Sequence, residues 1–252
     1  MNGGSSKMES GRALLNKAIE AHGGLRRWQS IKEIVVQIRC GGVALPLRFK
    51  FGTFKSYEGR ISTTKPHIIF SPFAGKEKRG VFSGNTVRIE SDKGQVLAER
   101  TNAKAAFNSF RHKFYWDNLD ALYFGGYAIW NYFTIPFLFL SEGFELEEID
   151  SWEENGQTWR RLRVFFPSDI PTHSREQVFY FNSEGLLMRI DYTAEVFGDW
   201  ARAAHFCRGH KNFSGLIIPT SRQVLPRKSN GFPRGFPTLV WIEVDQVVLV
   251  ER

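Results

Sequence analysis

Apolar and polar residues alternate along most of this chain, which is typical of strands that bury one face of a sheet and expose the other. The first alternating runs cover residues 34–40 and 43–51, on either side of Gly41-Gly42, and predict an antiparallel hairpin. Similar runs follow at short intervals, separated by turn-forming residues. We expect further strands at residues 68–70, 86–91, 95–100, 144–149, 159–166, 177–181, 186–192, 203–210, 216–225 and 239–250.

Two segments have helical spacing instead. Ser10 is a good N-cap, and apolar residues recur after it on one face of a helix. Residues 1–10 are rich in glycine, serine and other polar residues, so we expect a disordered segment there. Apolar and aromatic residues recur with helical spacing over 102–133, and we expect Gly125-Gly126 to loosen this second helix.

These elements predict an α+β protein with one long antiparallel sheet of about ten or eleven strands. One helix precedes the sheet and an aromatic helix interrupts it. No charge block, linker or repeat divides the chain, so residues 11–252 are expected to form a single domain. Because a meander of this length has to curl, its concave face needs filling, and the helix at 102–133 has the composition to fill it.

Two short motifs accompany this order of elements. The run 21–25 (AHGGL) with Trp28 ends the first helix, and an aromatic segment extends from 115–117 (YWD) to 136–137 (PF). Together they resemble the LolA-like superfamily, which includes bacterial lipoprotein carriers and uncharacterised soluble proteins. The resemblance covers residues 10–250 in element order. It implies an open half-barrel whose concave side holds a lipid-like or other apolar molecule, with helices as a lid.

The chain is unusually rich in aromatic residues, with 23 Phe, 7 Tyr and 7 Trp. Large flat side chains either pack a wide core or line a cavity for an apolar molecule. On the second helix they predict a site that binds an apolar small molecule or an acyl chain, although the same residues also fit a plain packed core. The candidate ligand-binding residues are Phe110, Phe114, Tyr115, Trp116, Tyr123, Tyr127 and Trp130.

The alternative function is a cofactor-independent isomerase, cyclase or dehydratase (lyase) that acts on a hydrophobic metabolite in the same cavity. An apolar stretch raises the pKa of a carboxyl group and suits it to acid–base chemistry, whereas a solvated helix end is the plainer interpretation. His173 and Glu195 would join His205 if the concave face is partly polar. The candidate catalytic residues are Asp117, Asp120, His112 and His205.

The net charge of +8 does not predict a nucleic-acid partner. Residues 1–100, 101–200 and 201–252 carry net charges of +10, −7 and +5, and the excess is spread over strand-like runs without a phosphate-binding loop, zinc finger or RNA-binding motif. The chain has two cysteines and no His-x-His or His-Glu-x-x-His spacing. We therefore expect no metal site and no cofactor.

Residues 121–141 contain no charged side chain and are long enough to cross a bilayer. Aromatic and polar residues are scattered through this segment, which favours a buried or surface-lying helix over a membrane span. Together with the basic excess, the segment supports a third hypothesis, a peripheral protein on an anionic membrane. Residues 1–11 contain no apolar signal region, so a cytoplasmic location with reduced cysteines is expected.

Overall fold

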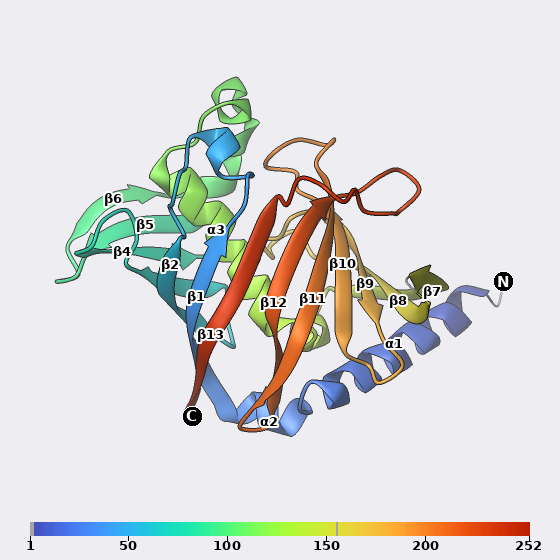
Figure 1. Cartoon of the computed structure of the whole chain (residues 1–252). Coiled ribbons are helices and arrows are strands. Elements are labelled where there is room, and N and C mark those ends of the chain that lie inside the picture. The colour runs from blue at the N-terminus through green and yellow to red at the C-terminus, as the bar shows by residue number, and fades with distance from the viewer. Residues whose placement is uncertain (1–2, 155) are drawn as a thin grey trace.

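The computed structural model describes residues 3–154 and 156–252, and its centre is one curved antiparallel sheet (Figure 1). The helices are α1 (Gly3–Ala21), α2 (Leu25–Ser30) and α3 (Asn118–Thr134), with short 3-10 turns η1 (Pro46–Arg48), η2 (Ala103–Asn108), η3 (Phe110–Lys113) and η4 (Phe137–Leu140). The strands are β1 (Ile31–Gly41), β2 (Ser56–Ser62), β3 (His67–Ser71), β4 (Lys78–Ser83), β5 (Thr86–Ser91), β6 (Val96–Arg100), β7 (Glu145–Glu154), β8 (Gln157–Phe165), β9 (Glu176–Phe181), β10 (Leu187–Thr193), β11 (Arg202–Phe213), β12 (Leu216–Pro226) and β13 (Val240–Glu251).

The sheet consists of two meanders joined by the last strand. Its order is β6-β5-β4-β3-β2-β1-β13-β12-β11-β10-β9-β8-β7, so β13 lies between β1 and β12. The pairing of β1 with β13 brings Ile34 opposite Leu249 and Cys40 opposite Ile242. Strands β6 and β7 form the two edges of an unclosed sheet, and α3 follows β6 in the chain and lies across the concave face (Figure 1). The α+β class and the curved, open sheet are thereby confirmed.

The sheet has thirteen strands, and the expected number of ten or eleven was too low. The sequence pattern did not reveal β2 and β4. In both strands a glycine occupies a buried position where alternation calls for a large apolar side chain, namely Gly59 and Gly80. A Cβ atom at Gly80 would lie 2.6 Å from Leu122 of α3, so this glycine allows the helix to approach the sheet closely.

The expected strand at 43–51 is a loop that contains η1, although the residues alternate. Pro46 cannot donate to a strand ladder, and the neighbouring amides bond locally, Arg48 to the carbonyl of Leu45 at 2.8 Å and Phe49 to that of Pro46 at 3.0 Å. Phe49 has a left-handed φ of 60°, which ends the turn. The prediction was wrong because the apolar residues in this run do not face the core, and Leu47 and Phe51 are exposed.

The first helix begins earlier than the sequence indicated. α1 starts at Gly3, so it includes most of the segment 1–10 that we expected to be disordered, and residues 1 and 2 lie outside the described range. Ser10 is inside the helix and not at its N-cap. Its hydroxyl donates a hydrogen bond to Glu148 on β7, which helps hold α1 against that edge of the sheet. At the other end of α1, Nδ1 of the buried His22 lies 2.7 Å from the carbonyl oxygen of Ala18 and caps the last turn.

The aromatic helix is shorter than predicted. Instead of one helix over 102–133, the short turns η2 and η3 precede α3, and extended backbone at Ser109 and Asp117 separates the three. Asp117 accepts a hydrogen bond from the backbone amide of Asp120, whose side chain accepts one from the amide of Asp117. This capping box defines the start of α3.

Gly125-Gly126 does not loosen α3, which is continuous from Asn118 to Thr134. The two glycines face the sheet at its closest approach. A Cβ atom at Gly126 would lie 2.5 Å from Cβ of Phe82 on β4, and one at Gly125 would overlap the ring tip of Phe54. They therefore allow the helix to lie deep in the concave face, as we predicted for the aromatic segment.

The convex face carries a buried ionic cluster that fixes the loop 227–239. Arg189 on β10 is fully buried; its guanidinium donates to Asp191 at 2.7 and 2.9 Å, to Glu154 at 2.6 Å, and to the backbone carbonyl of Gly231 in the loop. The rings of Trp152, Tyr180 and Phe206 surround it. Arg189 and Asp191 lie on the same face of β10, two residues apart, and this part of the convex face is covered and not solvated.

Candidate functional site

Two apolar cavities lie between α3, the central strands and the loops at one end of the sheet. Cavity A has a volume of about 320 Å³ and is bounded by loop 42–55, α3 and β13. Cavity B has a volume of about 350 Å³ and is bounded by the loops 194–201 and 227–239. Both cavities are lined by Phe124, Tyr192, Leu239 and Val240, so they are adjacent and share a wall.

One stripe of α3 faces cavity A. Phe124, Ala128 and Tyr132 are four residues apart and therefore lie one above the other on the same helix face. Gly125 and Ile129 complete the helix contribution. Ala128 provides open space because its side chain is small, while Phe124 and Tyr132 provide aromatic walls. The close approach of the glycines to the sheet thus also shapes the cavity.

The inner end of the cavities is polar. The hydroxyl of Tyr132 lies 2.7 Å from Nε2 of His173 and 3.2 Å from the hydroxyl of Tyr192, and the hydroxyl of Tyr127 lies 3.3 Å from Nδ1 of the same histidine. His173 stacks on Tyr192 with ring centroids 4.0 Å apart. All four side chains are buried. Tyr132 lines cavity A, His173 lines cavity B and Tyr192 lines both. We call these four residues the polar floor.

A buried arginine lies behind the polar floor. Arg222 on β12 donates to the backbone carbonyl of Tyr132 at 2.7 Å and lies 3.4 Å from Nε2 of His205 and 3.1 Å from Sγ of Cys207. Within the described residues, no carboxylate pairs with it, and its Nε and Nδ1 of His205 have no hydrogen-bond partner. A buried cation without an anion is costly, and its charge opposes protonation of the neighbouring His205.

The histidines and tyrosines around Arg222 are neutral near pH 7. Burial lowers the pKa of His173 to about 3. Burial and the charge of Arg222 lower the pKa of His205 well below its usual value. Burial raises the pKa of Tyr132 and Tyr192. The polar floor therefore offers hydrogen-bond donors and acceptors, but no ionised side chain, to a molecule in the cavities.

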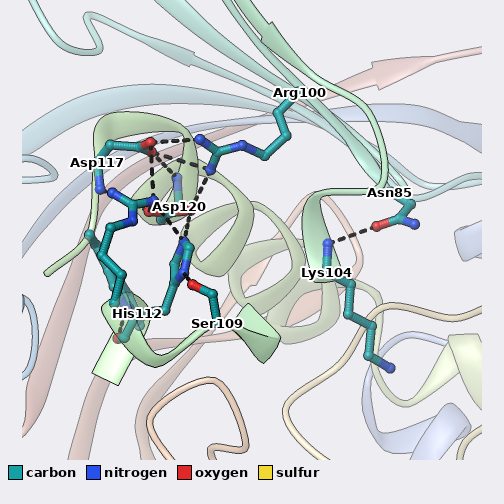
Figure 2. Close-up of polar contacts among 9 residues, drawn as sticks. Asn85, Arg100, Lys104, Ser109, His112, Asp117 and Asp120 are labelled. Atoms are coloured by element: carbon teal, nitrogen blue, oxygen red, sulfur yellow. Dashed lines mark hydrogen bonds and ion pairs between the residues drawn. The ribbon is translucent and has the colours of Figure 1, made fainter. Parts of the chain in front are cut away.

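The structure brings three of the four candidate catalytic residues together, but away from the cavities (Figure 2). Nε2 of His112 lies 2.9 Å from Oδ1 of Asp120, and its Nδ1 lies 2.6 Å from the hydroxyl of Ser109. Arg100 donates to Asp120 and, at 2.6 Å, to Asp117. Helical spacing did not predict the contact between His112 and Asp120, because η3 and the extended residue Asp117 fold the chain back between them.

This cluster stabilises the start of α3. Burial alone would raise the pKa of Asp117, but hydrogen bonds and charge from Arg100 and the amide of Asp120 outweigh it and lower the pKa. The expected rise for a carboxyl in this segment is thus wrong for Asp117. Asp120 is not solvated, since it is only 1% exposed. Because none of His112, Asp117 and Asp120 lines cavity A or B, we assign these residues to the helix start.

The fourth candidate, His205, lies on the concave face with Cys207, as alternation along its strand predicted. Its ring centroid is 4.5 Å from that of Tyr132, so it borders the polar floor. His173, which the sequence suggested as its neighbour, is part of the same group. Glu195 is exposed and does not point into it; only its backbone amide bonds to the carbonyl of His173.

The seven candidate ligand-binding residues form two groups, and neither contributes to the lining of cavities A and B. The exposed group, at the tip of η3 and after it, is Phe110, Phe114 and Tyr115. The buried group, which packs into the core around α3, is Trp116, Tyr123, Tyr127 and Trp130. Tyr127 belongs to the polar floor through its hydroxyl.

The sequence prediction placed most of the ligand-binding residues on or just before the helix that borders cavity A, but not on the face that lines it. Tyr123, Tyr127 and Trp130 share one face, and Phe124, Ala128 and Tyr132 share the next. Because both faces are apolar, spacing alone could not distinguish them. Tyr192 and Arg222 were missed as well. The feature that could have identified them is a polar side chain at an inward-facing position of a strand. Tyr192, for example, is two residues after Ile190 and therefore lies on the same inward face.

The charge-free segment 121–141 is almost entirely buried, which agrees with the expected buried helix. In the described part of the chain, no helix is both long and apolar enough to span a bilayer. Among those residues, no three His, Cys, Asp or Glu side chains are placed to hold a metal ion.

Comparison with known proteins identifies the fold. A LolA superfamily protein from Nitrosomonas europaea superimposes with a TM-score of 0.52 over 96% of this chain and 94% of its own, at 11% sequence identity. A DUF1329 family protein from Desulfovibrio piger gives a TM-score of 0.52 over 95% and 92%, at 10% identity. No family model and no curated protein sequence matches the chain. The predicted LolA-like fold is confirmed.

Proposed function

We propose that this LolA-like chain binds one apolar or amphipathic molecule, such as an acyl chain, in the paired cavities A and B. The observation that supports this most directly is their shared wall, because two adjoining apolar spaces of about 320 and 350 Å³ form a single compartment once Phe124 or Tyr192 shifts. Ligand sites of small molecules commonly have volumes of about 300–1,000 Å³. The open sheet and the helix across its concave face supply the walls.

The polar floor supports a ligand with one polar end. Hydroxyl and imidazole groups that are buried and neutral form hydrogen bonds with a hydroxyl, carbonyl or carboxyl group, but they do not attract a strongly charged head. An apolar tail would fill the cavities, where burial contributes about 25 cal/mol per Å² before ordering costs. The site thus fits an amphipathic molecule better than a polar metabolite.

The second candidate function is a cofactor-independent enzyme. The observation in its favour is the contact of 2.7 Å between the Tyr132 hydroxyl and Nε2 of His173. A phenol and an imidazole in hydrogen-bond contact can pass a proton to or from a bound molecule. However, burial lowers the pKa of His173 to about 3 and raises that of Tyr132, so both are poor proton carriers near pH 7. We therefore rank binding above catalysis.

The test uses the fluorescent fatty acid 11-(dansylamino)undecanoic acid as a probe. Ala128 lines cavity A and Ala203 lines cavity B, and both are buried. Ala128→Phe and Ala203→Phe add a ring to each space, so we expect the probe to bind at least about tenfold more weakly to each variant. Organic extraction and mass spectrometry of the purified wild type should identify the natural ligand, and this compound should be depleted in both variants.

Ala13→Phe is the matched control, because Ala13 is exposed on α1, away from both cavities. It should leave probe affinity unchanged, and thermal unfolding of all three variants should show that they fold. Equal probe affinity in wild type, Ala128→Phe and Ala203→Phe would refute the cavity site. A His173→Asn variant tests for catalysis: if the protein is an enzyme, the wild type converts the extracted compound and this variant does not, whereas a protein that only binds shows no conversion in either form.

A further inference from the structure

Four loops gather at one end of the sheet, around the entrances of cavities A and B. They are residues 42–55 with η1, 102–117 with η2 and η3, 194–201, and 227–239. Figure 1 shows them together at the upper end of the sheet, whereas α2 and the C-terminal end of α1 lie at the opposite end. We call these four segments the mouth loops. Segments 42–55, 194–201 and 227–239 supply much of the lining of the two cavities, and segment 102–117 lies beside them through the contact of Tyr115 with Phe49.

The mouth loops expose large apolar side chains. Phe236 is 82% exposed, Trp200 74% and Phe51 72%, far more than an aromatic side chain in a monomeric core. The full set of exposed apolar residues on these loops is Leu47, Phe49, Phe51, Phe110, Phe114, Tyr115, Trp200, Phe232 and Phe236. Phe49 and Tyr115 are in contact across two of the loops, with ring centroids 6.2 Å apart. Apolar residues gathered in this way mark an interaction site.

The same loops are basic. The four segments together contain nine lysines and arginines against three acidic residues, Asp117, Glu195 and Asp199. The basic side chains that are exposed or half-buried and form no ion pair with a described acidic residue are Lys50, Lys55, Lys104, Lys113, Lys228 and Arg234. Lys50 and Lys113 lie over the rings of Tyr115 and Phe110, at 5.6 and 5.7 Å. Positive charge and exposed rings therefore alternate on one surface.

This surface surrounds the open ends of the cavities. Leu47, Trp200 and Phe236 belong both to the exposed set and to the lining of cavity B. Lys50 and Lys55 line the entrance of cavity A. Whatever covers the mouth loops would thus lie directly over both entrances.

We propose that the mouth loops dock this protein on an anionic lipid bilayer. The phenylalanine, tyrosine and tryptophan rings insert at the level of the lipid headgroups, and the lysines and Arg234 contact lipid phosphates. Two features favour a bilayer over a protein partner. The exposed rings come from four separate loops, and the cavities that would receive an apolar molecule open at the same surface. The charge-free segment 121–141 takes no part, because it is buried.

The first experiment is co-sedimentation of the full chain with vesicles of phosphatidylcholine alone and of phosphatidylcholine with about a third phosphatidylglycerol, at about 0.15 M salt. Wild type should bind the anionic vesicles and release at high salt. Phe49→Ser combined with Phe51→Ser should weaken binding at least about tenfold, and so should Lys55→Glu combined with Lys113→Glu. Brominated lipid should quench tryptophan emission in wild type, and much less in Trp200→Phe.

Matched controls lie far from the mouth loops. Val248 is 59% exposed on β13, and Lys93 is exposed in the turn between β5 and β6, so Val248→Ser and Lys93→Glu should bind vesicles as wild type does. Failure of wild type to bind anionic vesicles, or equal losses in the control variants, would overturn the proposal. So would a dimer, seen by sedimentation velocity, that the Phe49→Ser, Phe51→Ser variant abolishes. Cavity binding is measured without vesicles, so failure here leaves that proposal standing.

Discussion

At the scale of single residues, two buried arginines are handled in opposite ways. Arg189 on the convex face is surrounded by Asp191, Glu154 and a carbonyl, so its charge is balanced by direct partners. Arg222 on the concave face has only a carbonyl and neutral side chains as described partners. The partners of Arg189 include the carbonyl of Gly231, so this arrangement holds the loop 227–239 in place. The charge of Arg222 opposes protonation of the neighbouring His205, whereas burial keeps the tyrosines of the polar floor neutral.

Replacement of Arg189 should therefore be strongly destabilising. Arg189→Met leaves Asp191 and Glu154 buried without their cation, and the loss should be about 3–5 kcal/mol of unfolding free energy. Urea denaturation checks this. Arg39→Met is the control, since Arg39 forms a similar two-bond contact with Asp245 but in the open, and it should change stability little. Equal effects of the two substitutions would contradict this account of Arg189.

At the scale of elements, α3 packs into the core with one face and lines cavity A with another, and sequence spacing could not distinguish the two faces. Its period was predictable from the recurrence of aromatic residues, but its start was not. Asp117 ends an extended stretch, and only the hydrogen bonds with Asp120 show that the helix begins there. The face toward the cavity was not predictable either, because it depends on where Gly125 and Gly126 allow the helix to touch Phe54 and Phe82.

We expect substitution by alanine to have different effects at Gly125 and at Gly126. Alanine improves helix propensity by about 1 kcal/mol. In Gly126→Ala the new methyl group meets Cβ of Phe82, which is fixed to β4, and overpacking of about 1–3 kcal/mol should cancel or exceed that gain. In Gly125→Ala it meets the ring tip of Phe54, which borders cavity A and can turn into it.

We therefore expect Gly126→Ala to be less stable than Gly125→Ala by thermal unfolding. Gly125→Ala should instead weaken binding of the dansyl fatty acid, since Phe54 would occupy part of cavity A. If the two variants were equally stable and bound the probe equally well, the close approach of α3 would not shape the cavity.

At the scale of the whole molecule, buried neutral histidines make stability depend on pH. Burial, together with the charges of His210 and Arg222, lowers the pKa of His22 to about 4, although its bond to Ala18 opposes this. Burial lowers the pKa of His173 to about 3, and burial with the charge of Arg222 lowers the pKa of His205 well below its usual value. Their usual value in an unfolded chain is about 6.5. Below that pH the unfolded state binds more protons than the folded state, so protonation favours unfolding.

Stability should thus be full above about pH 7 and should fall as the pH decreases from 6.5 toward 4. The loss at pH 5 should be on the order of 5 kcal/mol for the three histidines together. Urea denaturation at several pH values measures it, and His22→Gln should reduce the slope. A stability that is constant or rises between pH 7 and pH 5 would show that these histidines are not held neutral.

Much of the architecture followed from the order of elements, and less of the site did. Alternation predicted most strands, although glycines at inward positions hid β2 and β4. The cavities depend on loops 42–55, 194–201 and 227–239, whose paths are set by contacts far apart in sequence. The bond from Arg189 to Gly231 is one such contact. A local pattern does not contain this information.

The position of β13 has a consequence for a chain that emerges from the ribosome. Residues 240–251 are the last strand of the sheet to be synthesised, yet they occupy its centre, between β1 and β12. Until they arrive, each meander presents an open inner edge in addition to its outer one, and the two rows of unpaired amides invite pairing with other nascent chains. Synthesis of this sheet is therefore most vulnerable to aggregation just before β13 leaves the exit tunnel.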